Sequence, residues 1–138
     1  MTSVVIAETS TIDIAVDSDV VRVRQAMRTF AVNAALSLVD QTKIVTAASE
    51  LARNTLIYGG GGSAVLELLQ NGSRRGVRAK FADDGPGISD PTLALTDGYT
   101  TGGGLGLGLS GARRLMDELD LFTKVGEGTV VTAVKWER

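Results

Sequence analysis

Stretches of alternating or continuous apolar residues along the chain predict its strands. Asn71-Gly72 followed by Ser73 separates two of these stretches and predicts a tight hairpin turn. Gly126-Glu127-Gly128 separates the last two and predicts a second hairpin. The expected strands are residues 4–6, 11–16, 64–70, 76–82, 121–124 and 129–136.

Three other stretches repeat apolar residues three and four positions apart, which predicts helices at about residues 19–38, 41–57 and 107–119. Asp17, Ser18 and Asp19 offer N-cap chemistry to the first helix, and Asp40 offers it to the second. The glycines at 59–62 should end the second helix. In the mixed segment 89–101, one helical turn is expected near Leu93.

The order of these elements, β-β-α-α-β-β-α-β-β, predicts an α/β two-layer sandwich. Its sheet should be mostly antiparallel and mixed, with the helices covering one face. The sequence contains no internal repeat and no linker-like segment. We therefore expect residues 1–138 to form one domain, which is an ordinary size for a domain.

Composition excludes several kinds of chemistry. The chain has no cysteine and no histidine, so disulfides, thiolate metal sites and Ser-His catalysis are excluded. A phosphohistidine centred on this chain is excluded for the same reason. A site for Mg²⁺ remains open, because this ion prefers oxygen ligands.

Charge and hydropathy argue against nucleic-acid and membrane partners. The net charge is −2, and the one local basic run, Arg74, Arg75, Arg78 and Lys80, is interpreted as a solvated hairpin end. The sequence shows no signal-peptide pattern and no apolar stretch of the ~20 residues that span a bilayer. We expect a soluble, cytoplasmic protein that is a monomer or a weak dimer when free.

Glu50 and Asn54 form the first candidate for chemistry. They are four residues apart on the second helix, so they share a face about 6 Å apart along the axis. An Asn oxygen can bind a hard cation, and a nearby Glu can orient or deprotonate an attacking hydroxyl. The alternative is an ordinary solvated helix face.

The second candidate is the turn that follows the strand at residues 76–82. Asp83 can accept a hydrogen bond from an exocyclic amine, and Gly85 and Gly87 would let a flat ring lie against bare backbone. Pro86 stiffens the turn. An ordinary Asp-Gly turn is the alternative.

A glycine-rich segment at residues 100–109 leads into the last helix and is the third candidate. Free amides at a helix N-terminus form an anion site suited to phosphates. A P-loop motif is absent from the sequence. Residues 106–111 formally match G-x-G-x-x-G, but a dinucleotide site would need a βαβ unit around them.

The three candidate motifs, taken in this order along the chain, resemble those of a known protein superfamily. E-x-x-x-N on a helix, D-x-G-x-G after a strand and G-x-x-G-x-G-L before a helix resemble the GHKL (Bergerat-fold) ATPases and kinases. Within that superfamily, the chain is similar to the serine/threonine switch kinases of the stressosome over about residues 12–138. The segments that carry this similarity are residues 49–54, 84–88, 103–106, 114–118 and 134–136.

The resemblance implies a role for each candidate. Glu50 would be the general base, Asn54 would bind Mg²⁺, and Asp83 would accept from the adenine amino group. Thr129 matches a position that helps to hold adenine, and the loop would wrap the phosphates of ATP. The residues implied to bind the nucleotide are Asn54, Asp83, Gly85, Gly87, Thr101, Gly103, Gly104, Leu105, Gly106, Leu107, Gly108, Leu109 and Thr129.

The resemblance also implies partners. The chain would transfer the ATP γ-phosphate to Ser or Thr of STAS-domain scaffold or antagonist proteins, and it would activate a phosphatase regulator after release. An alternative is an anti-sigma factor kinase that sequesters a sigma factor. The same motifs occur in sensor histidine kinases, but this chain lacks a histidine and a dimerisation helix.

Overall fold

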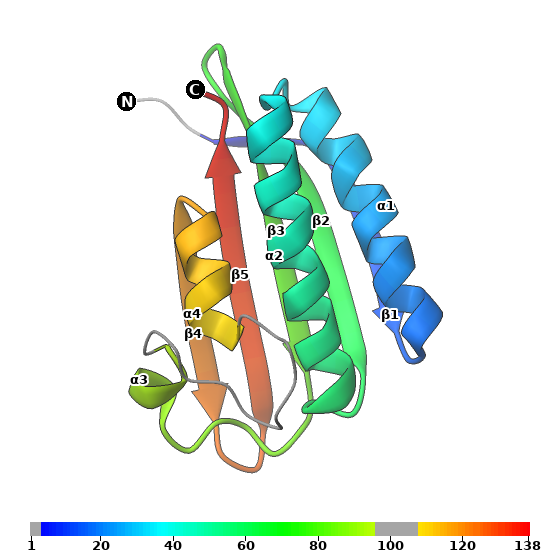
Figure 1. Ribbon diagram of the computed structural model, residues 1–138, viewed down its shortest axis with the longest axis vertical. Coiled ribbons are helices and arrows are strands. Elements are labelled where there is room, and N and C mark those ends of the chain that lie inside the picture. Colours follow the sequence, from blue (N-terminus) through cyan, green and yellow to red (C-terminus); the bar gives the residue numbers. More distant parts are fainter. Residues whose placement is uncertain (1–3, 96–107) are drawn as a thin grey trace.

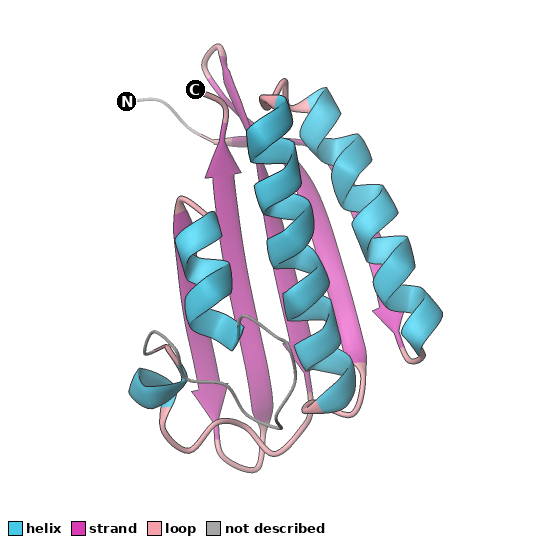
Figure 2. Cartoon of the chain, in the orientation of Figure 1, coloured by secondary structure: helices cyan, strands magenta, loops and turns pink. Residues whose placement is uncertain are grey.

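The computed structural model describes residues 4–95 and 108–138 as two layers, a five-stranded sheet and helices on one of its faces (Figures 1 and 2). The strands are β1 (Val5–Ile14), β2 (Gly62–Asn71), β3 (Arg74–Asp83), β4 (Glu118–Lys124) and β5 (Gly128–Trp136). The helices are α1 (Asp17–Asn33), α2 (Leu38–Ile57), α3 (Pro91–Ala94) and α4 (Gly108–Leu115).

The strands are ordered β1-β2-β3-β5-β4 in the sheet. All four pairings between these neighbours are antiparallel, so the described sheet contains no parallel pair. The predicted fold class, a largely antiparallel sheet with helices on one face, is confirmed. Within the described residues, none of the helices is long and apolar enough to cross a membrane.

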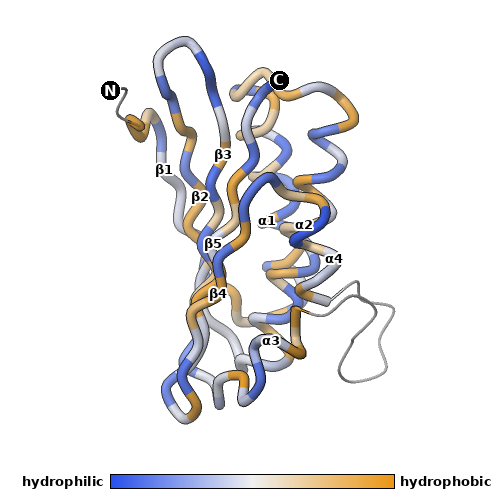
Figure 3. Tube along the Cα trace, turned by 90° about the vertical axis from the view of Figure 1, so that its left-hand side faces the viewer, coloured by the Kyte–Doolittle hydropathy of each residue, from blue (hydrophilic) through white to orange (hydrophobic). Residues whose placement is uncertain are grey.

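The core lies between the sheet and the helices, because alternate strand residues face that side. Figure 3 views the molecule from the side, with the strands on the left and the helices on the right. Each fully buried large side chain stabilises the fold by about 1.5–3 kcal/mol relative to an exposed one. Those in the core include Ile14, Met27, Ile44, Leu51, Leu66, Val77 and Phe81.

The first helix ends earlier than its apolar pattern predicts. α1 stops at Asn33, and Ala35 adopts a positive φ of 57° that turns the chain toward α2. Ala34 and Leu36 continue the apolar pattern because they are buried in the connection, not because they are helical. The predicted end near residue 38 is therefore wrong.

The second helix begins earlier than predicted, and Asp40 is not its cap. The Ser37 side chain caps α2 by accepting the Asp40 N–H at 3.1 Å. Asp40 itself is buried in the first turn of the helix, near Lys135.

Two further boundaries differ from the prediction. β1 is one continuous strand, with a register irregularity between Ile6 and Glu8, where the sequence predicts two strands. α4 ends at Leu115, because the Asp117 N–H already bonds to the Val134 carbonyl and starts the β4–β5 ladder. The residues predicted as the last turn of that helix therefore belong to the connection and to β4.

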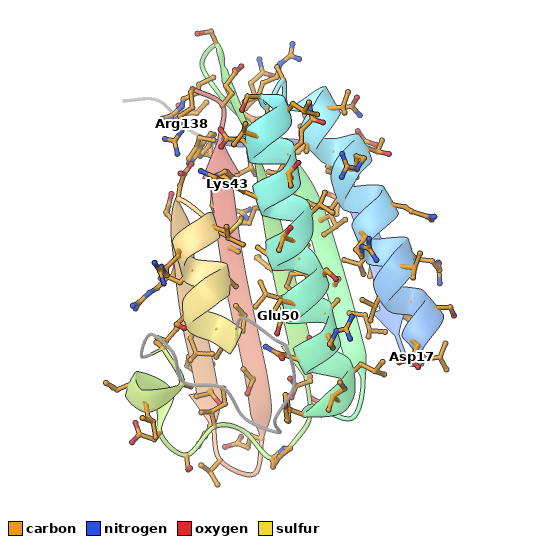
Figure 4. The ribbon with its side chains drawn as sticks, viewed as in Figure 1. Asp17, Lys43, Glu50 and Arg138 are labelled. Carbon is orange, nitrogen blue, oxygen red and sulfur yellow. The ribbon has the colours of Figure 1, made fainter. Side chains whose placement is uncertain are left out.

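An ion cluster around buried Lys135 lies at the C-terminal end of β5, where the β5 arrow points in Figure 1. Lys135 on β5 is 3% exposed, and its Nζ donates to the Leu115 carbonyl at 2.9 Å, at the end of α4. The same Nζ lies 3.8 Å from Asp40 Oδ1 and 3.7 Å from Asp117 Oδ1. Arg138, labelled in Figure 4, contacts both carboxylates from the exposed side. The cluster therefore ties α2, α4 and β5 together.

The pKa of Asp117 is lowered in this cluster. Burial raises it, but the Trp136 N–H and the charges of Lys135 and Arg138 outweigh that effect. A lowered pKa means that Asp117 stabilises the fold above its ordinary pKa of 3.8. This stabilisation is lost as the pH falls through the lower pKa of the folded state.

We predict that Asp117→Asn lowers the free energy of unfolding by about 1–3 kcal/mol at pH 7, because buried Lys135 loses a charged partner. The difference from wild type should shrink as the pH falls below about 4, where the carboxylate is protonated first in the unfolded chain and then, at its lowered pKa, in the folded one. Urea unfolding at pH 7, 4 and 3 measures this difference in unfolding free energy. Asp120→Asn, at an exposed residue of the neighbouring strand β4, is the control and should cost less than about 0.5 kcal/mol. A pH-independent difference would contradict this account of the cluster.

Candidate functional site

The candidate residues converge at the opposite end of the sheet from the ion cluster. Asp83 is the last residue of β3, and its Cα partners are Gly62 at the start of β2 and Thr129 at the start of β5. The C-terminal end of α2 packs above them, since Gly59 touches the Asp83 side chain. Three strand ends and one helix end therefore meet around one carboxylate.

The Asp83 carboxylate is half-buried and held by its own turn. Its Oδ1 accepts the Gly85 N–H at 2.9 Å. A Cβ atom built on Gly59 would lie 2.4 Å from Asp83 Cγ and 2.6 Å from Oδ2. Only a glycine at position 59 lets α2 end so close to this carboxylate. Among the described residues, a hydrogen bond is found at Oδ1 and none at Oδ2.

Other glycines allow equally close backbone contacts. At Gly128, where φ is +116°, a Cβ would lie 2.1 Å from the Asp83 carbonyl oxygen. At Gly87, where φ is +77°, it would lie 2.4 Å from the Lys124 carbonyl oxygen. At Gly85, it would lie 2.8 Å from the Gly59 Cα. Bare backbone thus lets the turn after β3 pack against the end of α2 and against the β4–β5 hairpin, a packing role that the sequence did not predict for Gly85 and Gly87.

Thr129 belongs to a hydroxyl cluster beneath the turn. Its Oγ1 lies 2.9 Å from Thr123 Oγ1 of β4. Thr123 Oγ1 also accepts the Ile88 N–H at 2.8 Å and donates to the Gly128 carbonyl at 3.2 Å. The turn that contains Gly85 and Gly87 is therefore bonded to Thr123 of β4, and Thr123 in turn contacts β5.

Glu50 and Asn54 lie on the part of α2 that faces the start of α4. Glu50, labelled in Figure 4, is half-buried, and its Oε1 accepts the Gly108 N–H at 3.4 Å. Asn54 is half-buried one turn later, and its main-chain carbonyl accepts the Tyr58 and Gly59 N–H groups. Glu50 thus contacts the first amide of α4, and Asn54 lies one turn closer to the end of α2 beside Asp83. The alternative of a solvated helix face is wrong.

The structure brings together the candidates from all three motifs where it describes them. Gly108 is the first residue of α4, and Leu109 is buried beneath it. Arg53 is exposed on α2. The dinucleotide interpretation of residues 106–111 is wrong, because the described strands form no parallel βαβ unit. The predicted loop residues Thr101, Gly103, Gly104, Leu105, Gly106 and Leu107 lie outside the described residues.

Sequence reasoning missed Thr123 and the packing role of Gly59. A signal existed for each. Thr123 follows Leu119 and Leu121 at an inward position of β4, where alternation calls for another apolar residue. Gly59 opens a run of four glycines, although one is enough to end a helix.

The chain belongs to the family described as histidine kinase-, DNA gyrase B-, and HSP90-like ATPase, whose model matches residues 39–137. Membership in this family confirms the predicted resemblance and implies the use of ATP. The chain is 43% identical over 129 residues to the serine/threonine-protein kinase RsbT of Bacillus subtilis. This match covers 94% of the chain and 97% of RsbT, so the chain is an RsbT homologue over nearly its full length.

Two solved structures share the fold. The RsbU and RsbW domains of Rv1364c from Mycobacterium tuberculosis align with a TM-score of 0.65 at 21% identity, over 96% of this chain and 33% of that one. The SiaB–SiaC complex from Pseudomonas aeruginosa aligns with a TM-score of 0.55 at 15% identity, over 95% of this chain and 90% of that one. At these identities, the two likenesses confirm the architecture alone.

We predict that two alanine substitutions in the β4–β5 hairpin differ sharply in cost. Gly126 and Gly128 both have positive φ, but only a Cβ at Gly128 would meet another backbone. Gly126→Ala should cost about 1 kcal/mol of unfolding free energy, from backbone strain alone. Gly128→Ala should cost more than about 3 kcal/mol, because β5 must move away from Asp83. Urea unfolding compares them, and equal costs would contradict the close contact.

Proposed function

We propose that the chain is an ATP-dependent serine/threonine-protein kinase. The observation that supports this most directly is the position of Glu50, an acidic side chain held against the first amide of α4 and one turn from Asn54. An anion site at a helix N-terminus thus lies beside a carboxylate that can take a proton. The 43% identity to the kinase RsbT supports the same activity.

In this proposal, Asp83 recognises adenine. Its Oδ1 is occupied by the Gly85 N–H, and its Oδ2 is the acceptor for an exocyclic amine. Gly59, Gly85 and Gly87 keep side chains away from the carboxylate and from the turn. A purine with an exocyclic amine suits such an acceptor, because one directional hydrogen bond to the carboxylate would orient the ring.

The phosphates would lie at the N-terminus of α4. Gly108 provides the first amide of this helix, and the helix dipole favours negative charge there. The glycines expected at residues 103–106 would add further amides. In the described structure, the Gly108 N–H bonds to Glu50, so a phosphate oxygen would replace a carboxylate oxygen at this amide.

The site also fits Mg²⁺. Asn54 offers a neutral amide oxygen, half-buried on the same side of α2 as Glu50. Oxygen ligands of this kind suit Mg²⁺, which commonly shares its coordination between protein and substrate phosphates. When bound, the ion would supply positive charge against the phosphate oxygens.

The role of Glu50 would be to receive the proton of the substrate hydroxyl. The Ser or Thr oxygen forms a bond to the γ-phosphorus, the bond from that phosphorus to the β–γ bridging oxygen breaks, and ADP leaves with the bond's electron pair. The hydroxyl proton passes to the Glu50 carboxylate. The acceptor would be a Ser or Thr of a STAS-domain protein, and the released kinase would bind a phosphatase regulator in the cytoplasm.

We predict that Glu50→Gln slows phosphate transfer to a STAS-domain substrate by about 10²–10⁴-fold, because the general base is lost. The dissociation constant for ADP should change less than threefold, roughly, since Glu50 does not hold the base. Radiolabelled phosphate transfer and calorimetric ADP titration measure the two effects. Glu8→Gln, an exposed residue of β1, should change neither quantity. Unchanged transfer in the Glu50 variant would overturn its assignment.

We predict that Asp83→Asn weakens ADP binding by about 10- to 100-fold, because a charged acceptor is replaced by a neutral amide. The Asn keeps the shape of the side chain and an oxygen that can accept the Gly85 N–H. Asp84→Asn, at the exposed next residue, is the matched control and should bind ADP like wild type. If both variants bind equally well, adenine is not recognised at Asp83.

A further inference from the structure

Thr123 is a polar side chain on the core side of β4 whose hydroxyl contacts three groups. It lies opposite Thr129 in the β4–β5 ladder, and their oxygens are 2.9 Å apart. The other two contacts are the Ile88 N–H at 2.8 Å and the Gly128 carbonyl oxygen at 3.2 Å. The kinase site proposed above does not require this hydroxyl.

The direction of each hydrogen bond follows from a count of protons and lone pairs. A hydroxyl has one proton to donate and two lone pairs that accept. The Ile88 amide can only donate, and the Gly128 carbonyl can only accept. Only one assignment makes all three contacts hydrogen bonds: Thr123 gives its one proton to the Gly128 carbonyl, and its remaining lone pair accepts from Thr129.

The consequence is a fixed polarity for Thr129. Its proton points toward β4, so its oxygen can only accept from a ligand in the site. Thr129 is also the Cα partner of Asp83, and both residues lie on the helix-covered side of the sheet. The site thus presents two acceptors, Asp83 Oδ2 and Thr129 Oγ1, from neighbouring strands.

We propose that Thr123 is a positioning residue that sets base specificity by holding the Thr129 proton away from the ligand. Two acceptors match a purine with an amino group at position 6. They disfavour a purine with an oxo group at position 6, because the oxygens of Asp83 and Thr129 would then face another hydrogen-bond acceptor. This inference rests on the proposed adenine site, and it adds a selection between 6-amino and 6-oxo nucleotides.

The test compares ADP with inosine diphosphate, each in the presence of Mg²⁺, by calorimetric titration. Wild type should prefer ADP. In Thr123→Val, a change of similar volume that removes the hydroxyl, the Thr129 proton becomes free to turn toward the ligand. The ratio of the two dissociation constants should then fall by about tenfold, mainly through tighter binding of inosine diphosphate. Thr123→Ser restores the hydroxyl and should keep the wild-type ratio.

A purely structural role for Thr123 gives a different result. Loss of its bond to the Ile88 N–H would loosen the turn and weaken the binding of both nucleotides by the same factor. The ratio of their dissociation constants would then stay unchanged, and this result would overturn the proposal. In a Thr129→Val background, the Thr123→Val change should no longer alter the ratio. If it still does, Thr123 does not act through Thr129.

Thr129→Val alone gives a second measurement that does not depend on the folding of the Thr123 variant. It removes one acceptor, so the binding of ADP should weaken more than the binding of inosine diphosphate. An unchanged ratio of the two dissociation constants would overturn the proposal. A wild-type protein that binds neither nucleotide would overturn the adenine site itself. Binding of both nucleotides by wild type with equal affinity would overturn only the inference about Thr123.

Discussion

The structure depends on the close approach of backbones around Asp83. Gly59 brings the end of α2 to the carboxylate, and Gly128 brings the start of β5 to the carbonyl of the same residue. A methyl group at either position would occupy space that Asp83 already fills. Three elements meet here without side chains between them. The Asp83 carboxylate therefore lies at the centre of the candidate site, whereas in an ordinary turn it would be exposed.

Two polar contacts, one at each end, join α4 to its neighbours, in addition to the burial of Leu109 and Ala112 in the core. Its first amide bonds to Glu50 of α2, and its last carbonyl accepts from buried Lys135 of β5. Lys135 in turn lies close to Asp40 at the start of α2. α2 therefore takes part in both contacts, so a displacement of α4 would disturb the proposed base and the ion cluster together.

The inner face of the sheet changes character toward the site. Over most of its length, this face is apolar, with residues such as Phe81 and Val131 in the core. Two residues farther along their strands, the same alternation brings Asp83 and Thr129 to the inner side, with Thr123 beside them on β4. The candidate site is thus a continuation of the core in which hydrogen-bonding groups replace apolar ones, and each of them has partners.

Local features of the sequence determined the kinds of elements, the hairpin turn at Asn71-Gly72, the order of the three motifs and hence the family. These features depend on neighbours within a few residues, so periodicity and glycine placement are enough to predict them. Tertiary contacts decided the rest: β5 lies between β3 and β4, α1 stops at Asn33, and Asp40 joins Lys135 instead of capping α2. The direction of the Thr123 hydroxyl depends on groups from another strand and from a turn 35 residues away. No local pattern contains that information, because the partners meet only after the chain has folded.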